Sequence, residues 1–134
     1  MCEEIQRSSH RHSNSTRDLS VLDSAEVFVL IDNVSDGLSS VPDGVSNEMD
    51  NIMEAGAECF SGESLCFACF GISLVVTSPI KDQTHTLLFD AGPNGTALEH
   101  NVPRLGVGMG AIKAVVLSHG HTDPASGLPT AIKL

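Results

Sequence analysis

Apolar residues gather in short continuous runs that are separated by polar and glycine-rich segments. Short runs rich in β-branched side chains are typical of β-strands, because buried helices need longer stretches. Four segments have this pattern, at residues 27–31, 72–77, 84–89 and 112–117. The first, second and fourth runs are apolar at nearly every position, which predicts strands covered on both faces. Residues 79–83 predict a turn, so the second and third strands should form an antiparallel hairpin.

Helical signals are weaker than the strand signals. Within the long polar connection after the first strand, residues 47–57 place apolar side chains at helical spacing, which predicts a short helix. A second helix should follow the hairpin, with Asn94 or Thr96 as its cap, and Pro103 should end it early. A further helix is predicted to start at about residue 125.

The N-terminal segment differs in composition from the rest of the chain. Residues 1 to about 20 are rich in Ser, Arg and His and almost free of apolar side chains. Such a segment cannot bury enough surface to offset the entropy of ordering, so we expect a disordered tail over residues 1–24 and one domain over residues 25–134. His10 and His12 have metal-binding spacing, but a solvated tail is the favoured interpretation. No apolar core of a secretory signal is present, whereas an organelle transit peptide stays open.

The fourth apolar run ends in an abrupt change of polarity. His119, His121 and Asp123 follow it at alternate positions. Side chains at i and i+2 of an extended segment point to the same side, so these three should converge beyond the end of the strand. Imidazole nitrogens and carboxylate oxygens are ligands for zinc and other divalent transition metals. Gly120 should help by removing a side chain from the crowded loop and letting the backbone bend toward an ion.

Two further patterns are weighed against simpler interpretations. Asp90 follows the third strand as His119 follows the fourth, and a carboxylate in such a position usually caps a turn, which is the favoured interpretation. Cys66 and Cys69 form a C-x-x-C pair, a spacing found in zinc and redox centres. The remaining cysteines form no second pair, and the motif enters an apolar run rather than a helix. A packing role is therefore favoured over redox chemistry.

The segment after the fourth run resembles the H-x-H-x-D-H signature of the metallo-β-lactamase superfamily of metal-dependent hydrolases. Five phrases along the chain are similar, in the same order, to one branch of it, the 7,8-dihydropterin-6-methyl-4-(β-D-ribofuranosyl)aminobenzene-5′-phosphate synthase-like proteins. The phrases are LIDN at 30–33, LSS at 38–40, GISL at 71–74, LFDAG at 88–92 and VLSHGH at 116–121. The resemblance covers about residues 25–134. It implies the N-terminal half of an αββα sandwich, an α+β or α/β fold with a mixed sheet and flanking helices.

The resemblance also implies roles for individual residues. His119 and His121 would bind a first ion, zinc or another divalent metal, while Asp123 would help to bind a second ion and take part in catalysis. Asp90 would orient a ligand from behind it or face a substrate phosphate. Pro124 stands where the signature has its last histidine, and proline has no ligand atom.

Two other departures from the family pattern bear on function. Phe70 stands where this branch usually has a histidine, and the remaining ligands of the superfamily come from a C-terminal half that these 134 residues do not include. The resemblance thus implies an incomplete fold with weak metal binding or none, and a small phosphate-bearing substrate only where the fold is completed. Strands without their usual cover also predict an exposed sheet face and self-association through it.

Charge and composition exclude other classes of function. The 17 acidic and 7 basic residues give a formal charge of −10, which argues against binding to nucleic acids and to anionic membranes. The five Phe residues, without Trp or Tyr, offer no platform for base stacking. No apolar run approaches the roughly 18 residues of a membrane span. We expect a soluble chain in a reducing, cytoplasmic environment, with organelle targeting left open.

Two classes of function remain. In the first, the chain is part of a metal-dependent enzyme whose ion activates water or polarises a substrate oxygen. In the second, it is non-catalytic, either a truncated gene product or an acidic interaction module that keeps the fold. A catalytic zinc normally has three protein ligands, and the resemblance implies that the third histidine of the first ion comes from the C-terminal half. The second class is therefore favoured for the chain as written.

Overall fold

The computed structural model describes residues 21–35 and 37–134. The predictions for the first twenty residues, including the disordered tail and the pair His10 and His12, lie outside the described residues. Residues 21–25 have no regular secondary structure, and the first strand begins directly after them. The described fold therefore starts at the position where the apolar pattern begins.

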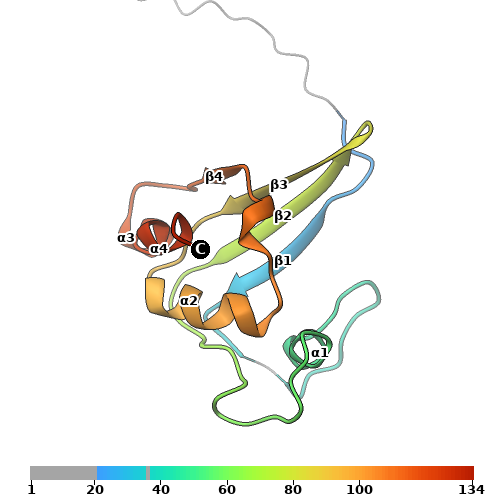
Figure 1. Cartoon of the computed structure of the whole chain (residues 1–134), viewed down its shortest axis with the longest axis vertical. Helices are drawn as coiled ribbons and strands as arrows, with labels where there is room; N and C mark the ends of the chain where they lie inside the picture. The colour runs from blue at the N-terminus through green and yellow to red at the C-terminus, as the bar shows by residue number, and fades with distance from the viewer. Residues whose placement is uncertain (1–20, 36) are drawn as a thin grey trace, which may run out of the picture.

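The described residues form one mixed four-stranded sheet with helices packed against it (Figure 1). The strands are β1 (Glu26–Ile31), β2 (Ser73–Ile80), β3 (Gln83–Phe89) and β4 (Ala114–Val116), and they lie side by side in that order. β1 and β3 are both antiparallel to β2, whereas β4 runs parallel to β3. The predicted α+β class with a mixed sheet is confirmed. The two-sheet sandwich implied by the resemblance stays a prediction.

The predicted hairpin of β2 and β3 is present, and its turn is tighter than the sequence pattern suggests. β2 continues through Pro79 to Ile80, so that only Lys81 and Asp82 separate it from β3. Lys81 has a φ of 56°, the left-handed conformation that two-residue hairpin loops commonly need. The paired strands therefore extend to the end of the hairpin.

The helices largely follow the predictions. They are α1 (Glu48–Glu54), α2 (Gly95–Arg104), the 3-10 turn η1 (Met109–Ala111), α3 (Thr122–Ala125) and α4 (Leu128–Ala131). Asn47 caps α1 and Asn94 caps α2, each by accepting a hydrogen bond from a backbone N–H of the first turn. Pro103 does not end α2 early, because a proline in the last turn removes only one intrahelical hydrogen bond. No helix in the described part of the chain is long and apolar enough to cross a membrane.

The predicted C-terminal helix is replaced by two single turns, α3 and α4. Gly127 lies between them and approaches the Ala91 carbonyl so closely that a Cβ would overlap its oxygen. The Gly127 N–H also donates to the Gly92 carbonyl at 2.9 Å. This close approach holds the end of α3 against the segment that follows β3.

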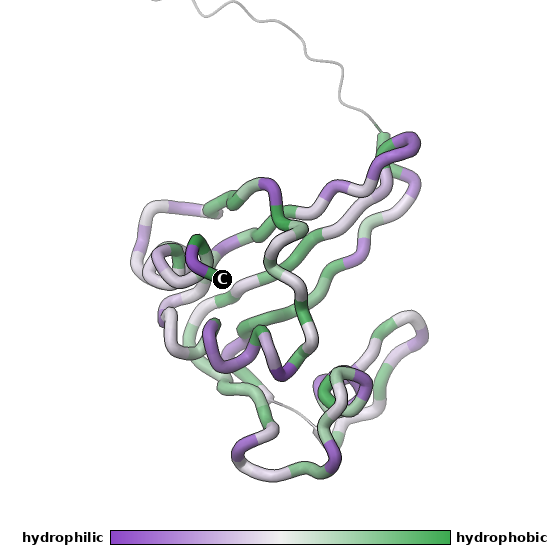
Figure 2. Tube along the Cα trace, viewed as in Figure 1, coloured by the Kyte–Doolittle hydropathy of each residue, from purple (hydrophilic) through white to green (hydrophobic). Residues whose placement is uncertain are grey.

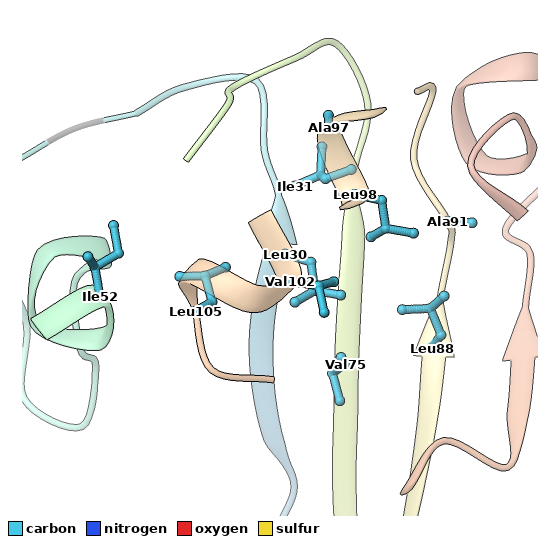
Figure 3. Close-up of a cluster of buried hydrophobic side chains, with 10 residues drawn as sticks. All are labelled: Leu30, Ile31, Ile52, Val75, Leu88, Ala91, Ala97, Leu98, Val102 and Leu105. Carbon is cyan, nitrogen blue, oxygen red and sulfur yellow. The ribbon is translucent and has the colours of Figure 1, made fainter. Parts of the chain in front are cut away.

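One face of the sheet is covered by α2 (Figure 3). Leu98 and Val102 lie one helical turn apart and pack with Leu30, Val75 and Leu88 of the first three strands, and all five are buried. Full burial of such a side chain contributes about 1.5–3 kcal/mol, so this layer supplies much of the stability.

The opposite face of the sheet is apolar and only partly covered. Cα partners on neighbouring strands carry their side chains on the same face, so the strand pairing defines two rows of residues there. The first row is Val27, Val76, Leu87 and Ala114, and the second is Val29, Leu74, Phe89 and Val116. None of these eight side chains is buried. We call these eight residues the open face.

The open face corrects the prediction that the apolar strands are covered on both sides. Val27 and Val29 of β1 are 55% and 47% exposed, and every residue of β4 is exposed. Leu74 and Val76 of β2 are half-buried. Hydrophobicity indicates that a strand favours cover, but it does not show that the chain supplies that cover. The exposed sheet face that the sequence also predicts is present.

Asn101 of α2 ties the long connection between β1 and β2 to the rest of the fold. It is 1% exposed, and its amide nitrogen donates to the carbonyls of Leu30 and Phe67 at 2.8 and 3.0 Å. Its side-chain oxygen accepts from the Phe67 N–H at 2.8 Å. The neighbouring His100 ring stacks on Phe67 with centroids 3.6 Å apart. All hydrogen-bonding atoms of this buried amide therefore have partners, as burial of a polar group requires.

Candidate metal centre

The segment after β4 brings the three predicted ligands together. His119 lies in the loop, His121 is the N-cap residue of α3, and Asp123 lies in the first turn of that helix. One ligand atom from each lies within 4.8 Å of the other two. Figure 2 shows the same segment as a hydrophilic stretch that follows the apolar β4. The predicted convergence of the side chains is confirmed, and the group can hold a metal ion.

The three residues converge by a different route from simple alternation. The backbone bends at residues 118–121, although His121 itself is extended at φ −94° and ψ −179°, and the helical turn that follows places Asp123. Oδ1 of Asp123 therefore lies 3.5 Å from Nε2 of His119, an i, i+4 pair. The rings of His119 and His121 meet edge to face with centroids 4.6 Å apart. The helix start accounts for the aspartate, whereas the two histidines lie on a bent loop and not on the extended segment that the alternation argument assumes.

The spacing of these atoms fits a tetrahedral cation such as zinc. With zinc–ligand bonds of about 2.0–2.2 Å, two ligands of a tetrahedral site lie roughly 3.4 Å apart. The separation between His119 and Asp123 already matches this value at 3.5 Å. The widest separation is at most 4.8 Å, and the side chain of His121 is exposed. The pair of His119 and Asp123 therefore already has the ligand separation of such a site.

A chain of hydrogen bonds fixes the ring of His119. Oδ2 of Asp90 accepts from the Ser118 hydroxyl at 2.7 Å, and Ser118 Oγ lies 2.9 Å from Nδ1 of His119. A carboxylate only accepts hydrogen bonds, so the hydroxyl proton points to Asp90 and Ser118 Oγ accepts from the Nδ1–H of the ring. This tautomer leaves Nε2, the nitrogen that faces Asp123, available to a metal.

Asp90 anchors that chain of hydrogen bonds. It is 3% exposed, and its φ of 56° is a left-handed conformation that Asp adopts more readily than most residues. Its Oδ1 accepts from the Ser118 N–H at 2.7 Å, and its own N–H donates to the Val116 carbonyl at 2.8 Å. Its carbonyl accepts from the Ser73 hydroxyl at 2.8 Å. Among the described residues, the carboxylate therefore binds the loop after β4, next to a candidate ligand, and makes no contact with its own strand-end turn of the kind that the sequence favours.

Pro124 has a packing role in this arrangement. Its side chain is fully buried, and its carbonyl accepts from the Ala91 N–H at 2.7 Å. The segment before β2 closes on the same turn, because a Cβ on Gly71 would lie 3.2 Å from the Asp123 carbonyl oxygen. Gly71 itself has a φ of 110°, which favours glycine. These contacts fix the backbone that carries Asp123.

The backbone bends at Gly120, but the prediction that the loop is crowded there is wrong. Its φ lies outside the left-handed region, and an added Cβ would meet no atom within 4 Å. The loop is therefore not crowded at this position, because the side chains of His119 and His121 are exposed on the outside of the fold. A larger residue would fit here without strain.

The candidate centre is open to solvent. The side chains of His119 and Asp123 are 43% and 26% exposed. A surface cavity of about 440 Å³ lies beside them, and its lining is Gly120, His121, Thr122, Ala125 and Ser126. Water and small molecules can therefore reach an ion at this position.

The C-x-x-C pair lies in the connection before β2 and has no disulfide. Burial, with the neighbouring Glu48 carboxylate, raises the pKa of the Cys66 thiol from 9.0 to about 12. Burial also raises the pKa of Cys69. Redox and metal-binding cysteines need an accessible thiolate, so these shifts support the packing interpretation.

Ser118 is the residue of the site that the sequence analysis missed. A metal-binding histidine commonly donates its second ring N–H to an outer partner, so a hydroxyl next to His119 was a usable signal. The pairing of that hydroxyl with Asp90 spans 28 positions, and it depends on the parallel alignment of β3 and β4. No local pattern predicts such a contact.

Comparison with models of protein families finds none that matches this chain, and comparison with curated proteins finds no match. The functional assignment therefore rests on the geometry of the described residues.

Proposed function

We propose that His119, His121 and Asp123 bind one divalent cation, with zinc as the preferred ion. The observation that carries this proposal is the approach of all three ligand atoms to within 4.8 Å, with the ring of one ligand held by an outer chain of hydrogen bonds. Two imidazoles and a carboxylate suit zinc better than magnesium or calcium, which favour all-oxygen sites.

The chemistry of such a centre is that of metal-assisted hydrolysis. Three protein ligands leave one position of a tetrahedral zinc for water, and a zinc ion lowers the pKa of bound water and polarises substrate oxygens. Within this chain His119, His121 and Asp123 would hold the ion, while Ser118 and Asp90 would keep the first of them in the required tautomer. Asp123 acts here as a ligand of the same ion as the histidines, because its Oδ1 faces Nε2 of His119.

The fold gives this proposal a wider context. A mixed sheet with helices on one face and an apolar opposite face is compatible with one half of a metallo-β-lactamase-like αββα sandwich. The strand, hairpin, helix and strand that precede His119 follow the order that the resemblance implies. We propose that the chain carries the metal-binding segment of this architecture, and that a phosphate-bearing small molecule is a substrate only where the fold is completed.

Weak metal binding and little or no hydrolysis are proposed for the chain itself. The three ligands come from one short segment, two of them are exposed, and the fully buried Pro124 adds no ligand atom. The alternative is a non-catalytic acidic interaction module. That alternative is supported by the open face together with the net charge of −10.

Calorimetric titration with zinc tests the metal proposal. The parent for this experiment carries His10→Ala and His12→Ala, which removes adventitious binding by the tail. We expect about one ion per chain, loss of binding in His119→Ala, and unchanged binding in His85→Ala. His85 is the matched control because it is an exposed histidine on β3 outside the cluster. Equal binding by the two variants, or two tightly held ions in the parent, would contradict the proposal.

A further inference from the structure

A groove of about 800 Å³ runs along the outer side of β1. Its lining includes every residue from Ala25 to Leu30 and no residue of β2. A sheet face presents alternate residues of a strand, so a cavity that touches consecutive residues lies against the edge of the strand. β1 is an edge strand, and no strand in the described part of the chain pairs with its outer side. The groove therefore follows a backbone edge and is distinct from the open face.

The opposite wall of the groove is formed by α1 and the segments around it. Figure 1 shows β1 at the edge of the sheet and α1 beyond it. Glu48 fixes this wall, because its carboxylate accepts from the Cys66 N–H at 2.8 Å and from the Ser35 hydroxyl at 3.0 Å. Asn101 also lines the groove, and its amide nitrogen donates to the Leu30 carbonyl near the end of β1. Hydrogen bonds within the chain thus hold the groove in its shape.

The lining of the groove combines carboxylates with exposed apolar side chains. Glu26, Asp32 and Glu54 are exposed, and the half-buried Glu48 adds a fourth carboxylate. None of the described residues that line the groove is Lys, Arg or His. A fitting ligand therefore carries positive charge, apolar groups and main-chain hydrogen-bonding groups. The large apolar side chains that line the groove and are exposed are Val27, Val29, Val34, Val45 and Phe67.

We propose that this groove binds an extended, lysine- or arginine-rich segment of a partner protein, which adds to the sheet as a strand beside β1. Strand addition supplies main-chain hydrogen bonds along a free edge, while the surroundings of alternate side chains determine which sequences fit. Four carboxylates without a compensating cation select positive side chains and reject acidic ones. A nucleic acid does not fit, because its phosphates would face the same carboxylates.

This inference deepens the alternative of an acidic interaction module and does not depend on the metal proposal. The lining of the groove contains none of the three candidate ligands, and neither Ser118 nor Asp90 belongs to it. The groove follows β1, whereas the candidate metal centre follows β4 at the opposite edge of the sheet. Peptide binding is therefore measured with EDTA present, and the zinc titration is measured without peptide, so that either proposal can fail alone.

Fluorescence anisotropy of the full chain tests the inference. The probe is a labelled peptide of about eight residues in which lysine alternates with valine or threonine. Glu54→Lys is paired with the control Glu99→Lys, because Glu99 is an exposed glutamate on α2 that does not line the groove. Both variants change the net charge equally, so only the position of the new charge differs. Circular dichroism confirms that each variant is folded.

Two control peptides separate the contributions of charge and backbone. In the first, glutamate replaces every lysine. The second keeps the lysines but carries methyl groups on alternate backbone nitrogens, which removes the donors that a new strand needs.

The parent should bind the lysine peptide saturably, and raising the salt concentration from about 50 to 500 mM should weaken binding at least about threefold. Glu54→Lys should weaken it at least about fivefold, whereas Glu99→Lys should stay within about twofold of the parent. Neither control peptide should bind saturably. Equal weakening by the two variants, or equal binding of the methylated peptide, would overturn the inference.

A second occupant to be tested is the chain's own N-terminal segment, which carries Arg7, Arg11 and Arg17. A variant with all three replaced by Gln separates this segment from a partner protein. Binding of the lysine peptide by that variant but not by the parent would assign the groove to the N-terminal segment and overturn the proposal of a separate partner. Absence of saturable binding in both proteins would show that the groove does not take up a basic strand.

Discussion

The hydroxyl of Ser118 lies 2.7 Å from Oδ2 of Asp90, although the two residues are 28 positions apart in the chain. The parallel pairing of β3 with β4 brings the ends of both strands to the same edge of the sheet, and each residue follows one of these ends. The contact determines which nitrogen of His119 carries its proton, because Ser118 Oγ also lies 2.9 Å from Nδ1. The fold thus prepares one candidate ligand before any ion is bound.

Replacing Ser118 tests that preparation. Ser118→Ala should weaken zinc binding about 10- to 100-fold, the usual effect of removing an outer partner of a ligating histidine. Nitrogen NMR of the His119 ring should show loss of the Nδ1–H tautomer preference in the same variant. Ser118→Thr keeps the hydroxyl and should restore both properties.

The matched control for this prediction is Ser126→Ala. Ser126 is an exposed serine beside the same cavity and has no part in the hydrogen bonds to His119. An affinity for zinc in Ser118→Ala within twofold of the parent, with an unchanged tautomer signal, would show that the hydroxyl does not position the ring.

Substitution by alanine should lower stability strongly at Gly127 and hardly at all at Gly120. A Cβ at Gly127 would overlap the Ala91 carbonyl oxygen, whereas a Cβ at Gly120 would meet no atom within 4 Å. Gly127→Ala should lower the free energy of unfolding by about 2–4 kcal/mol, because backbone must move to accept the methyl group. Gly120→Ala should change it by less than about 0.5 kcal/mol. Denaturant unfolding of the two variants measures both values, and similar losses in both would contradict the packing described at α3.

The cysteines provide a test based on reactivity. At pH 8 an alkylating reagent should modify the exposed Cys59 roughly 100-fold faster than Cys66, because burial and a raised pKa keep the Cys66 thiol protonated. Peptide mapping by mass spectrometry gives the rate at each site. In denaturant the difference should disappear. A Cys66 that reacts as fast as Cys59 in the folded protein would reopen the redox interpretation of the C-x-x-C pair.

The raised pKa of Cys66 also makes the free energy of unfolding depend on pH. The folded state favours the neutral Cys66 thiol, so the stabilisation is fully present below pH 9.0 and is lost as the pH rises toward about 12. Cys66→Ala removes this titrating group. The free energy of unfolding of the parent should therefore fall more steeply than that of the variant over this window, and parallel curves would contradict the assignment.

Prediction from sequence succeeded where the determining interactions are local. The spacing of His119, His121 and Asp123 requires only a strand end and a helix start, and both lie within a few residues. Sequence-based prediction failed where the burial of a residue, or its contact partner, depends on a segment that is distant in the sequence. Residues 112–117 have the composition of a buried strand, yet every residue of β4 is exposed: Ala114 and Val116 lie on the open face, and Val115 lies at the edge of the other face. The break at Gly127 likewise depends on Ala91, which sequence patterns do not place beside it.

Reinstating the superfamily signature by Pro124→His should not create a second metal site or measurable hydrolysis. Pro124 is fully buried, and its carbonyl is bonded to the Ala91 N–H. A histidine there would place an imidazole in an apolar position rather than toward the ligands, at a cost of about 1–3 kcal/mol unless it finds a hydrogen-bond partner. No other cluster of three ligand side chains occurs among the described residues to complete a second ion's coordination.

Pro129→His is the control for that substitution, because Pro129 is an exposed proline in α4 and away from the three ligands. Metal content after dialysis, thermal melting, and turnover of a chromogenic phosphate ester and a chromogenic lactam are measured on both variants and the parent. We expect a lower melting temperature for Pro124→His alone, at most one ion in every protein, and no turnover. Two ions per chain in Pro124→His would show that the side chain turns toward the ligands despite its burial. Turnover in that variant would show that this segment builds a working centre by itself, since the substitution changes a single side chain next to Asp123.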